Sequence, residues 1–130
     1  MISAIARVAG VSMRAMRGAT QLRADSRDEM VEAVVELLSE LLQRNGLSTD
    51  DLISVIFTST PDLRTEFPAA AARTLGIGDV PLLCAQELKI SGALPRVVRV
   101  LAHFESSVPR DQVQHVYLRG AEVLRQDLAQ

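Results

Sequence analysis

The sequence predicts a single α/β domain: a five-stranded mixed sheet accompanied by two main helices. A long amphipathic segment with helix caps lies near the start, and short apolar runs rich in β-branched residues alternate with helical segments. Hydrophobic residues make up 48% of the 130 positions, which is enough for one core. With only three phenylalanines and one tyrosine, that core must be built mainly from aliphatic side chains.

The first strand is expected in residues 13–20 (MRAMRGAT), and the clearest helix follows it. Ser26 is a good N-cap residue, and Glu29 stands at the capping-box spacing from it. Apolar residues then recur at helical spacing until Asn45-Gly46, a pair that favours a left-handed stop. These signals predict a helix over about residues 27–45.

The rest of the chain continues the alternation. DLISVIFTST (51–60) is typical of a buried strand, and Pro61 ends it. EFPAAAARTLG (66–76) predicts a second helix with Pro68 in its first turn and Gly76 at its end. The last three strands are expected in DVPLLCAQ (79–86), in LPRVVRVLAHFES (94–106), where Val97, Val98 and Val100 favour a strand, and in QHVYL (114–118).

The resulting order is β-α-β-α-β-β-β over one domain, residues 1–130, without a linker or a repeat. Two helices are too few to cover both faces of a five-stranded sheet. We therefore expect other subunits to bury the uncovered face, which predicts a homo-oligomer.

Composition excludes several classes of function. A net charge of −2 and an aromatic content of 3% argue against nucleic-acid binding, which needs a basic excess and stacking side chains. No apolar run approaches the roughly 20 residues that span a bilayer. The start has no basic region of a signal peptide, and a single cysteine fits a reducing compartment. A cytoplasmic protein is expected.

The sequence contains few of the motifs that mark catalytic machinery. His103 and His115 have no partner at zinc-ligand spacing, and phosphate-binding or nucleophile-elbow motifs do not occur. Cys84, three residues before Glu87 in PLLCAQELK, would need an activating base as a nucleophile, and neither histidine lies in a catalytic signature. Buried filler and a hydrogen-bonding group in a binding site both remain open for this thiol.

Polar residues nevertheless gather at the ends of the expected elements. Several arginines, one carboxylate, one thiol and one phenol would suit a small anion that carries a hydroxyl. A solvated set of charges would give a similar pattern, and codon usage explains the excess of arginine over lysine equally well. The set consists of Arg17, Arg73, Cys84, Glu87, Arg99, Tyr117 and Arg125.

Five stretches together resemble the monofunctional, trimeric α/β chorismate mutases, in order and at the right separations. They are MRAMRGAT, TSTPDLRTEFPAAAAR, VPLLCAQE, LPRVVRVL and DQVQHVYLRGAEVLRQDL, and the resemblance covers about residues 13–128. It implies conversion of chorismate to prephenate on the way to phenylalanine and tyrosine, without a metal or a cofactor. It also implies a homotrimer that forms a pseudo-α/β barrel, with active sites between neighbouring subunits.

The resemblance implies a role for each matched residue. The arginine of RGAT, Arg17, would bind a substrate carboxylate, and the last arginine of RVVR, Arg99, would face the ether oxygen. Glu87 would accept a hydrogen bond from the ring hydroxyl, with Cys84 beside it. Further residues would line or close the site: Tyr117 at a carboxylate, Arg73 at the cleft mouth, Phe67 and Ala69 on the wall, Leu82 and Leu83 in the pocket, and Leu124 and Arg125 over it.

Two departures from the family and two alternatives remain. Ala70 stands where the family often has a charged residue, and residues 1–12 extend beyond the family's usual start. A trimeric protein that binds small anions without mutase activity would also gather arginines in subunit clefts. A purely structural trimer would leave Arg17 and Arg99 facing water. A plain anion binder has little need of the Glu87 carboxylate, so Glu87 and Arg99 together distinguish the mutase.

Overall fold

The computed structural model describes residues 10–125, and its elements follow the predicted order. They are β1 (Ser12–Gln21), α2 (Arg27–Arg44), β2 (Leu52–Ser59), α3 (Pro68–Arg73), β3 (Leu82–Gln86), β4 (Val97–Ser106) and β5 (Val116–Leu118), with 3-10 turns η2 (Thr49–Asp51), η3 (Arg110–Gln112) and η4 (Ala121–Arg125). Within this part of the chain, no helix is long and apolar enough to cross a membrane.

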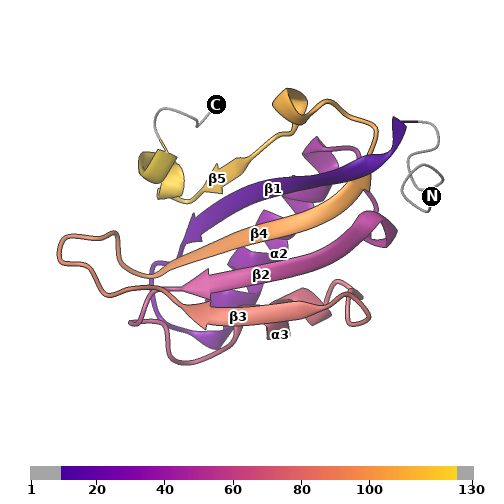
Figure 1. The fold of residues 1–130 in the computed structure, drawn as a ribbon. Helices are drawn as coiled ribbons and strands as arrows, with labels where there is room; N and C mark the ends of the chain where they lie inside the picture. Colours follow the sequence, from indigo (N-terminus) through magenta and orange to yellow (C-terminus); the bar gives the residue numbers. More distant parts are fainter. Residues whose placement is uncertain (1–9, 126–130) are drawn as a thin grey trace.

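The five strands form one mixed sheet in the order β3-β2-β4-β1-β5 (Figure 1). The central strand, β4, runs antiparallel to both β1 and β2, whereas β3 is parallel to β2 and β5 is parallel to β1. The predicted five-stranded mixed sheet with two helices is confirmed. This order places the N-terminal strand between the two C-terminal strands.

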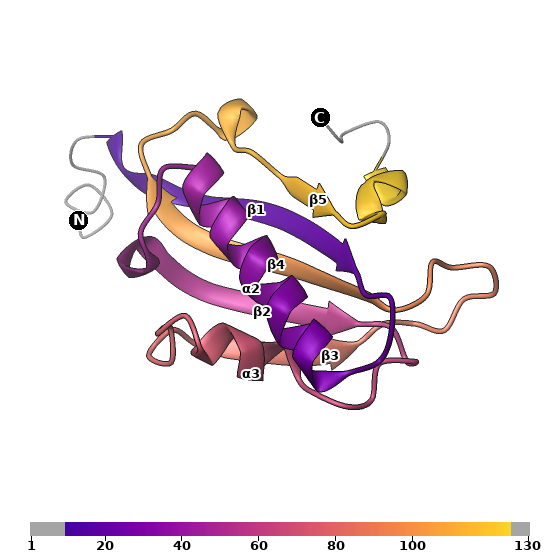
Figure 2. The ribbon, with the colours of Figure 1, turned by 180° about the vertical axis from the view of Figure 1, so that it is seen from behind.

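Both α-helices lie against the same face of the sheet, as the two opposite views show (Figures 1 and 2). The core fills the space between them and includes Phe57, Phe104, Leu37 and Leu41, all fully buried. Gly18 permits this close packing, because a Cβ atom there would lie 3.0 Å from both Leu37 Cδ1 and a backbone oxygen of β5. Across residues 10–125, no α-helix covers the other face, which we call the open face.

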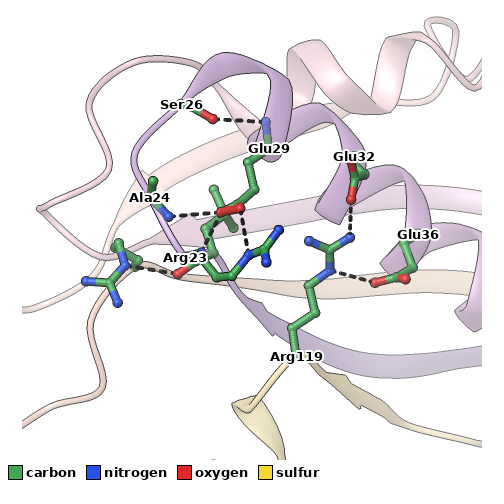
Figure 3. Close-up of polar contacts among 9 residues, drawn as sticks. Arg23, Ala24, Ser26, Glu29, Glu32, Glu36 and Arg119 are labelled. Atoms are coloured by element: carbon green, nitrogen blue, oxygen red, sulfur yellow. Dashed lines mark hydrogen bonds and ion pairs between the residues drawn. The ribbon is translucent and has the colours of Figure 1, made fainter.

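Helix α2 begins as predicted, with one difference at its cap (Figure 3). The Ser26 hydroxyl accepts the Glu29 N–H at 3.1 Å, which is one half of a capping box. The Glu29 carboxylate, however, accepts the N–H groups of Arg23 and Ala24 instead of reaching back to Ser26. This carboxylate therefore fastens the β1–α2 connection to the helix. At the other end Gly46 has φ +64°, the left-handed stop that the sequence predicts.

Arg119 joins the end of β5 to α2 (Figure 3). Its guanidinium donates to Glu32 at 2.8 Å and to Glu36 at 2.9 Å, one helical turn apart on α2. The residue has φ +57°, a left-handed conformation that is uncommon outside glycine. This pair of contacts holds the chain at the point where it turns from β5 into η4.

The Thr20 hydroxyl yields a prediction about stability. It is fully buried on the helix-covered face and has no hydrogen-bond partner among the residues described here. Thr20→Val removes a desolvated polar group at nearly constant volume, so we expect the free energy of unfolding to rise by about 1 kcal/mol. Urea denaturation at one fixed protein concentration measures the change.

Thr60→Val is the matched control. That hydroxyl, also buried, accepts the Val97 N–H at 3.0 Å and donates to Asp62, so its loss should destabilise the protein by about 1–3 kcal/mol. If Thr20→Val destabilises the protein as much as Thr60→Val, the Thr20 hydroxyl has a partner and the account of this strand is wrong.

Candidate active site

A hollow of about 270 Å³ on the open face collects four of the predicted site residues. Strand pairing explains why they meet, because Ala19 of β1 stands in register with Arg99 of β4 on one side and Tyr117 of β5 on the other. Arg17, two residues earlier on β1, points to the same face. The lining consists of Arg17, Arg99, Tyr117 and Arg125, together with Gly18, Ile56, Thr58, Val100 and Leu101.

Arg99 is held by a carboxylate at the edge of this hollow. Arg99 Nε lies 3.0 Å from Glu87 Oε2, and the Glu87 side chain is only 16% exposed whereas that of Arg99 is 45% exposed. The Thr58 hydroxyl donates to the same oxygen at 2.6 Å, and the Glu87 N–H donates to the Ser59 carbonyl at 2.9 Å. The carboxylate is therefore fixed from two strands, and it directs an exposed guanidinium into the hollow.

The charges of the hollow suit a small dianion. Three guanidinium groups and one phenol line it, and the Glu87 carboxylate pairs with Arg99. Planar guanidinium groups bind carboxylates through paired hydrogen bonds. The Glu87 carboxylate, which contacts Thr58 and Arg99 at the edge of the hollow, is a hydrogen-bond acceptor. The hollow is thus lined by groups of the kind that bind carboxylates, with a carboxylate beside one of them.

Cys84 and Phe67 line a different hollow, of about 240 Å³. Cys84 stands in register with Phe57 and packs against the core, and Phe67 is 68% exposed just before α3. Within one chain, the thiol therefore does not share a hollow with Arg99. None of the described residues around this second hollow is a histidine, so the structure offers Cys84 no imidazole base.

The other predicted residues also divide between the two sides of the sheet. Leu124 packs beside Tyr117 in a small cluster with Ala19 and Val97, next to the first hollow. Leu83 of β3 is 60% exposed, whereas Leu82 packs against the core. On α3, Ala69 is buried and Arg73 is exposed. One chain thus brings together Arg17, Glu87, Arg99, Tyr117, Leu124 and Arg125, and it leaves Phe67, Ala69, Arg73 and Cys84 apart from them.

Two residues that the sequence analysis did not select support this site. One is Thr58, which could have been found from the alternation of DLISVIFTST, since Phe57 is buried on the helix-covered face. The other is His115, whose Nδ1 accepts the Arg17 backbone N–H at 3.0 Å. Burial lowers the pKa of His115, and the charges of Arg17 and Arg125 lower it further. Nothing in the sequence pattern pointed to this contact, which joins residues far apart in the chain.

The sequence model of the chorismate mutase type I family matches residues 13–128. The chain belongs to this family. A chorismate mutase AroH from Thermus thermophilus is 48% identical over 117 residues, covering 89% of this chain and 96% of the relative. A chorismate mutase AroH from Bacillus subtilis (strain 168) is 37% identical over 118 residues, covering 90% and 93%.

A solved structure agrees with these relatives. The chorismate mutase from Clostridium thermocellum is 42% identical, with a TM-score of 0.82 over 84% of this chain and 97% of that one. Together these likenesses confirm the predicted activity: the chain is a chorismate mutase, an isomerase that forms prephenate from chorismate in aromatic amino acid biosynthesis.

The role of Cys84 in this chorismate mutase is testable by two substitutions. Because no imidazole lines its hollow, the thiol is expected to act as a weak hydrogen-bonding group and not as a nucleophile. Cys84→Ser should keep kcat/KM within about 3-fold of wild type, since a hydroxyl also donates and accepts. Cys84→Ala should lose more, about 5- to 100-fold, if a polar partner is left unpaired.

Steady-state kinetics on purified variants between about pH 6 and 9 measures both effects, with wild-type rates nearly flat across this range. An inactive serine variant, or a rate that climbs with the pKa of a thiol, would show that the thiolate takes part in the reaction.

Proposed function

We propose that chorismate binds in the open-face hollow, and that Arg99 drives the rearrangement there by stabilising the ether oxygen as its bond breaks. The observation that carries this proposal is the Arg99–Glu87 pair. It sets an oriented guanidinium beside a carboxylate in a hollow that is otherwise cationic.

The reaction is a unimolecular pericyclic rearrangement, so it requires no nucleophile and no proton transfer. The enzyme must instead hold the flexible enolpyruvyl arm over the ring in a chair-like geometry. Fixing that geometry before reaction removes rotational freedom from the barrier. The two substrate carboxylates provide the handles, and Arg17, Tyr117 and Arg125 are placed to bind them.

Negative charge develops during the reaction, and the site would stabilise it electrostatically. The C–O bond breaks ahead of C–C bond formation, so negative charge builds on the ether oxygen. A fixed guanidinium at that oxygen favours the transition state over the substrate. Glu87 would hold Arg99 in place and accept a hydrogen bond from the ring hydroxyl, and Thr58 keeps the carboxylate oriented.

A homotrimer would complete the site. The open face exposes Leu83 and Met13, which are 60% and 62% exposed, and large exposed apolar side chains on one face favour burial by another chain. The exposed Phe67 and Arg73 could then reach the hollow of a neighbouring subunit, forming the cleft wall and mouth. We also propose that the enzyme is cytoplasmic, because its one cysteine fits a reducing compartment.

The alternative from the sequence, a trimeric protein that binds small anions without catalysis, is disfavoured by membership of the chorismate mutase family. The partly buried Glu87 also disfavours it, because a carboxylate at the hollow weakens the binding of a simple anion. The loss of chorismate absorbance after addition of the purified protein distinguishes the two. Binding without absorbance loss would support the anion-binding alternative.

Arg99→Lys tests the mechanism itself. Lysine keeps the positive charge, but a point-like ammonium cannot contact Glu87 and the ether oxygen with the same fork geometry. We expect kcat to fall about 100- to 1,000-fold, equivalent to roughly 3–4 kcal/mol of transition-state stabilisation.

Arg44→Lys is the control, because Arg44 pairs with Glu40 on the surface of α2, on the helix-covered side. This variant should keep wild-type kinetics. An Arg99→Lys enzyme within a few-fold of the control would remove Arg99 from the centre of the mechanism.

A further inference from the structure

One hydrogen bond on the open face joins the imidazole of His115 to the backbone of Arg17. The Arg17 N–H donates to His115 Nδ1 at 3.0 Å. Backbone pairing between β1 and β5 begins with the next residue on each strand, Gly18 opposite Val116. The imidazole therefore extends this short parallel ladder by one hydrogen bond, at the residue that carries the guanidinium of the hollow.

We propose that His115 in its neutral form is a positioning residue for Arg17, and that its protonation releases Arg17 and weakens the binding of the substrate carboxylate. This inference rests on the proposed function, in which Arg17 binds a carboxylate of chorismate.

The chemistry of the imidazole explains why the neutral form is required. Nδ1 accepts a hydrogen bond only when it is unprotonated, so the contact with Arg17 places the single ring proton on Nε2. A protonated ring has donors at both nitrogens, and Nδ1–H would then face the Arg17 N–H. The bond to His115 is lost in that state, and at this position β1 keeps only its pairing with β4, where Arg17 stands opposite Leu101.

The groups that surround His115 disfavour the protonated ring. The half-buried ring borders a hollow of about 390 Å³, and none of the described residues that line this hollow carries a carboxylate. The basic groups are Arg14 and Arg17 from β1, His103 from β4 and Arg110 from η3, which line the hollow, and Arg125 from η4, whose charge also acts on the ring.

Substrate binding should depend on pH through the protonation of His115. Burial first, and then the charges of Arg17 and Arg125, lower the pKa of His115 below its ordinary value. The neutral ring and its bond to Arg17 are therefore fully present at neutral pH and above. They are lost as the pH falls through this lowered pKa, so substrate binding should weaken only on the acid side.

A positioning role and a merely structural role predict different kinetics. A carboxylate contact is made in both the bound substrate and the transition state, so its loss raises KM and leaves kcat nearly unchanged. A loss of folding alone would reduce the fraction of active enzyme, which lowers the apparent kcat at constant KM. The split between KM and kcat thus separates the two roles.

Three variants of the 130-residue chain test the proposal. His115→Asn keeps an acceptor near the Nδ1 position that cannot be protonated, and His115→Ala removes the acceptor. His103→Asn is the matched control, because His103 borders the same hollow but contacts Ser54 at 3.2 Å and not Arg17. Each is assayed for KM and kcat with chorismate between pH 5 and 7.5.

At pH 7.5 we expect His115→Ala to raise KM about 5- to 10-fold with kcat within about 2-fold, and His115→Asn to stay within about 3-fold of wild type in both. As the pH falls through the lowered pKa of His115, KM should rise in the wild type and in His103→Asn but stay flat in His115→Asn. An acid limb that persists in His115→Asn, or an alanine variant that loses kcat at constant KM, would overturn the proposal.

The ring state can be read without substrate. Imidazole ¹⁵N NMR of the wild-type protein at pH 7.5 should show His115 neutral with its proton on Nε2, and a proton on Nδ1 would contradict the proposal. Because this readout is independent of turnover, it separates the two hypotheses: a wild-type protein without mutase activity but with the Nε2–H form would refute the proposed function and leave the Arg17–His115 contact standing.

Discussion

Both α-helices pack on the same face of the sheet. Because strand side chains alternate between faces, each strand places every second side chain in the core and the others on the open face. Odd and even positions divide accordingly: Phe57 enters the core while Thr58, its neighbour, reaches the open face. The same alternation directs Arg99 away from the flanking Val98 and Val100, which are buried. The open face can therefore carry charge without interrupting the core, and this arrangement makes a cationic hollow compatible with a stable domain.

The hollow depends on the Glu87 carboxylate, which pairs with Arg99. Glu87 is mostly buried and also accepts a hydrogen bond from the Thr58 hydroxyl. Its negative charge therefore orients the Arg99 guanidinium. The guanidinium groups of Arg17, Arg99 and Arg125 line the hollow that we propose for a substrate with two carboxylates. Contacts outside the hollow fix its walls: Gly18 lets α2 lie close to β1, and Arg119 fastens the turn before Arg125 to α2.

Local signals were enough to predict the order of elements and both ends of α2. The second helix is shorter than its pattern suggested, because after Arg73 the backbone makes i→i+3 bonds that carry the turn to Gly76. The meeting of Arg17 with Arg99 and Glu87 could be expected only through the family resemblance, since strand pairing joins distant segments. Neither local patterns nor the family resemblance predicted the role of His115. Its contact with Arg17 is a single side-chain hydrogen bond between residues 98 positions apart, and such a contact produces no periodic pattern in the sequence.

We propose above all that Arg99 of one chain and Phe67 and Arg73 of its neighbour act on the same substrate. Subunit complementation measures this most directly: inactive Arg99→Ala chains are unfolded, mixed with Phe67→Ala/Arg73→Ala chains in equal amounts and refolded together. If sites form between chains, random assembly gives about a quarter of them an intact set, and the mixture regains roughly that share of wild-type activity. A mixture no more active than the average of its parents, with mixed oligomers shown to form, would contradict the account.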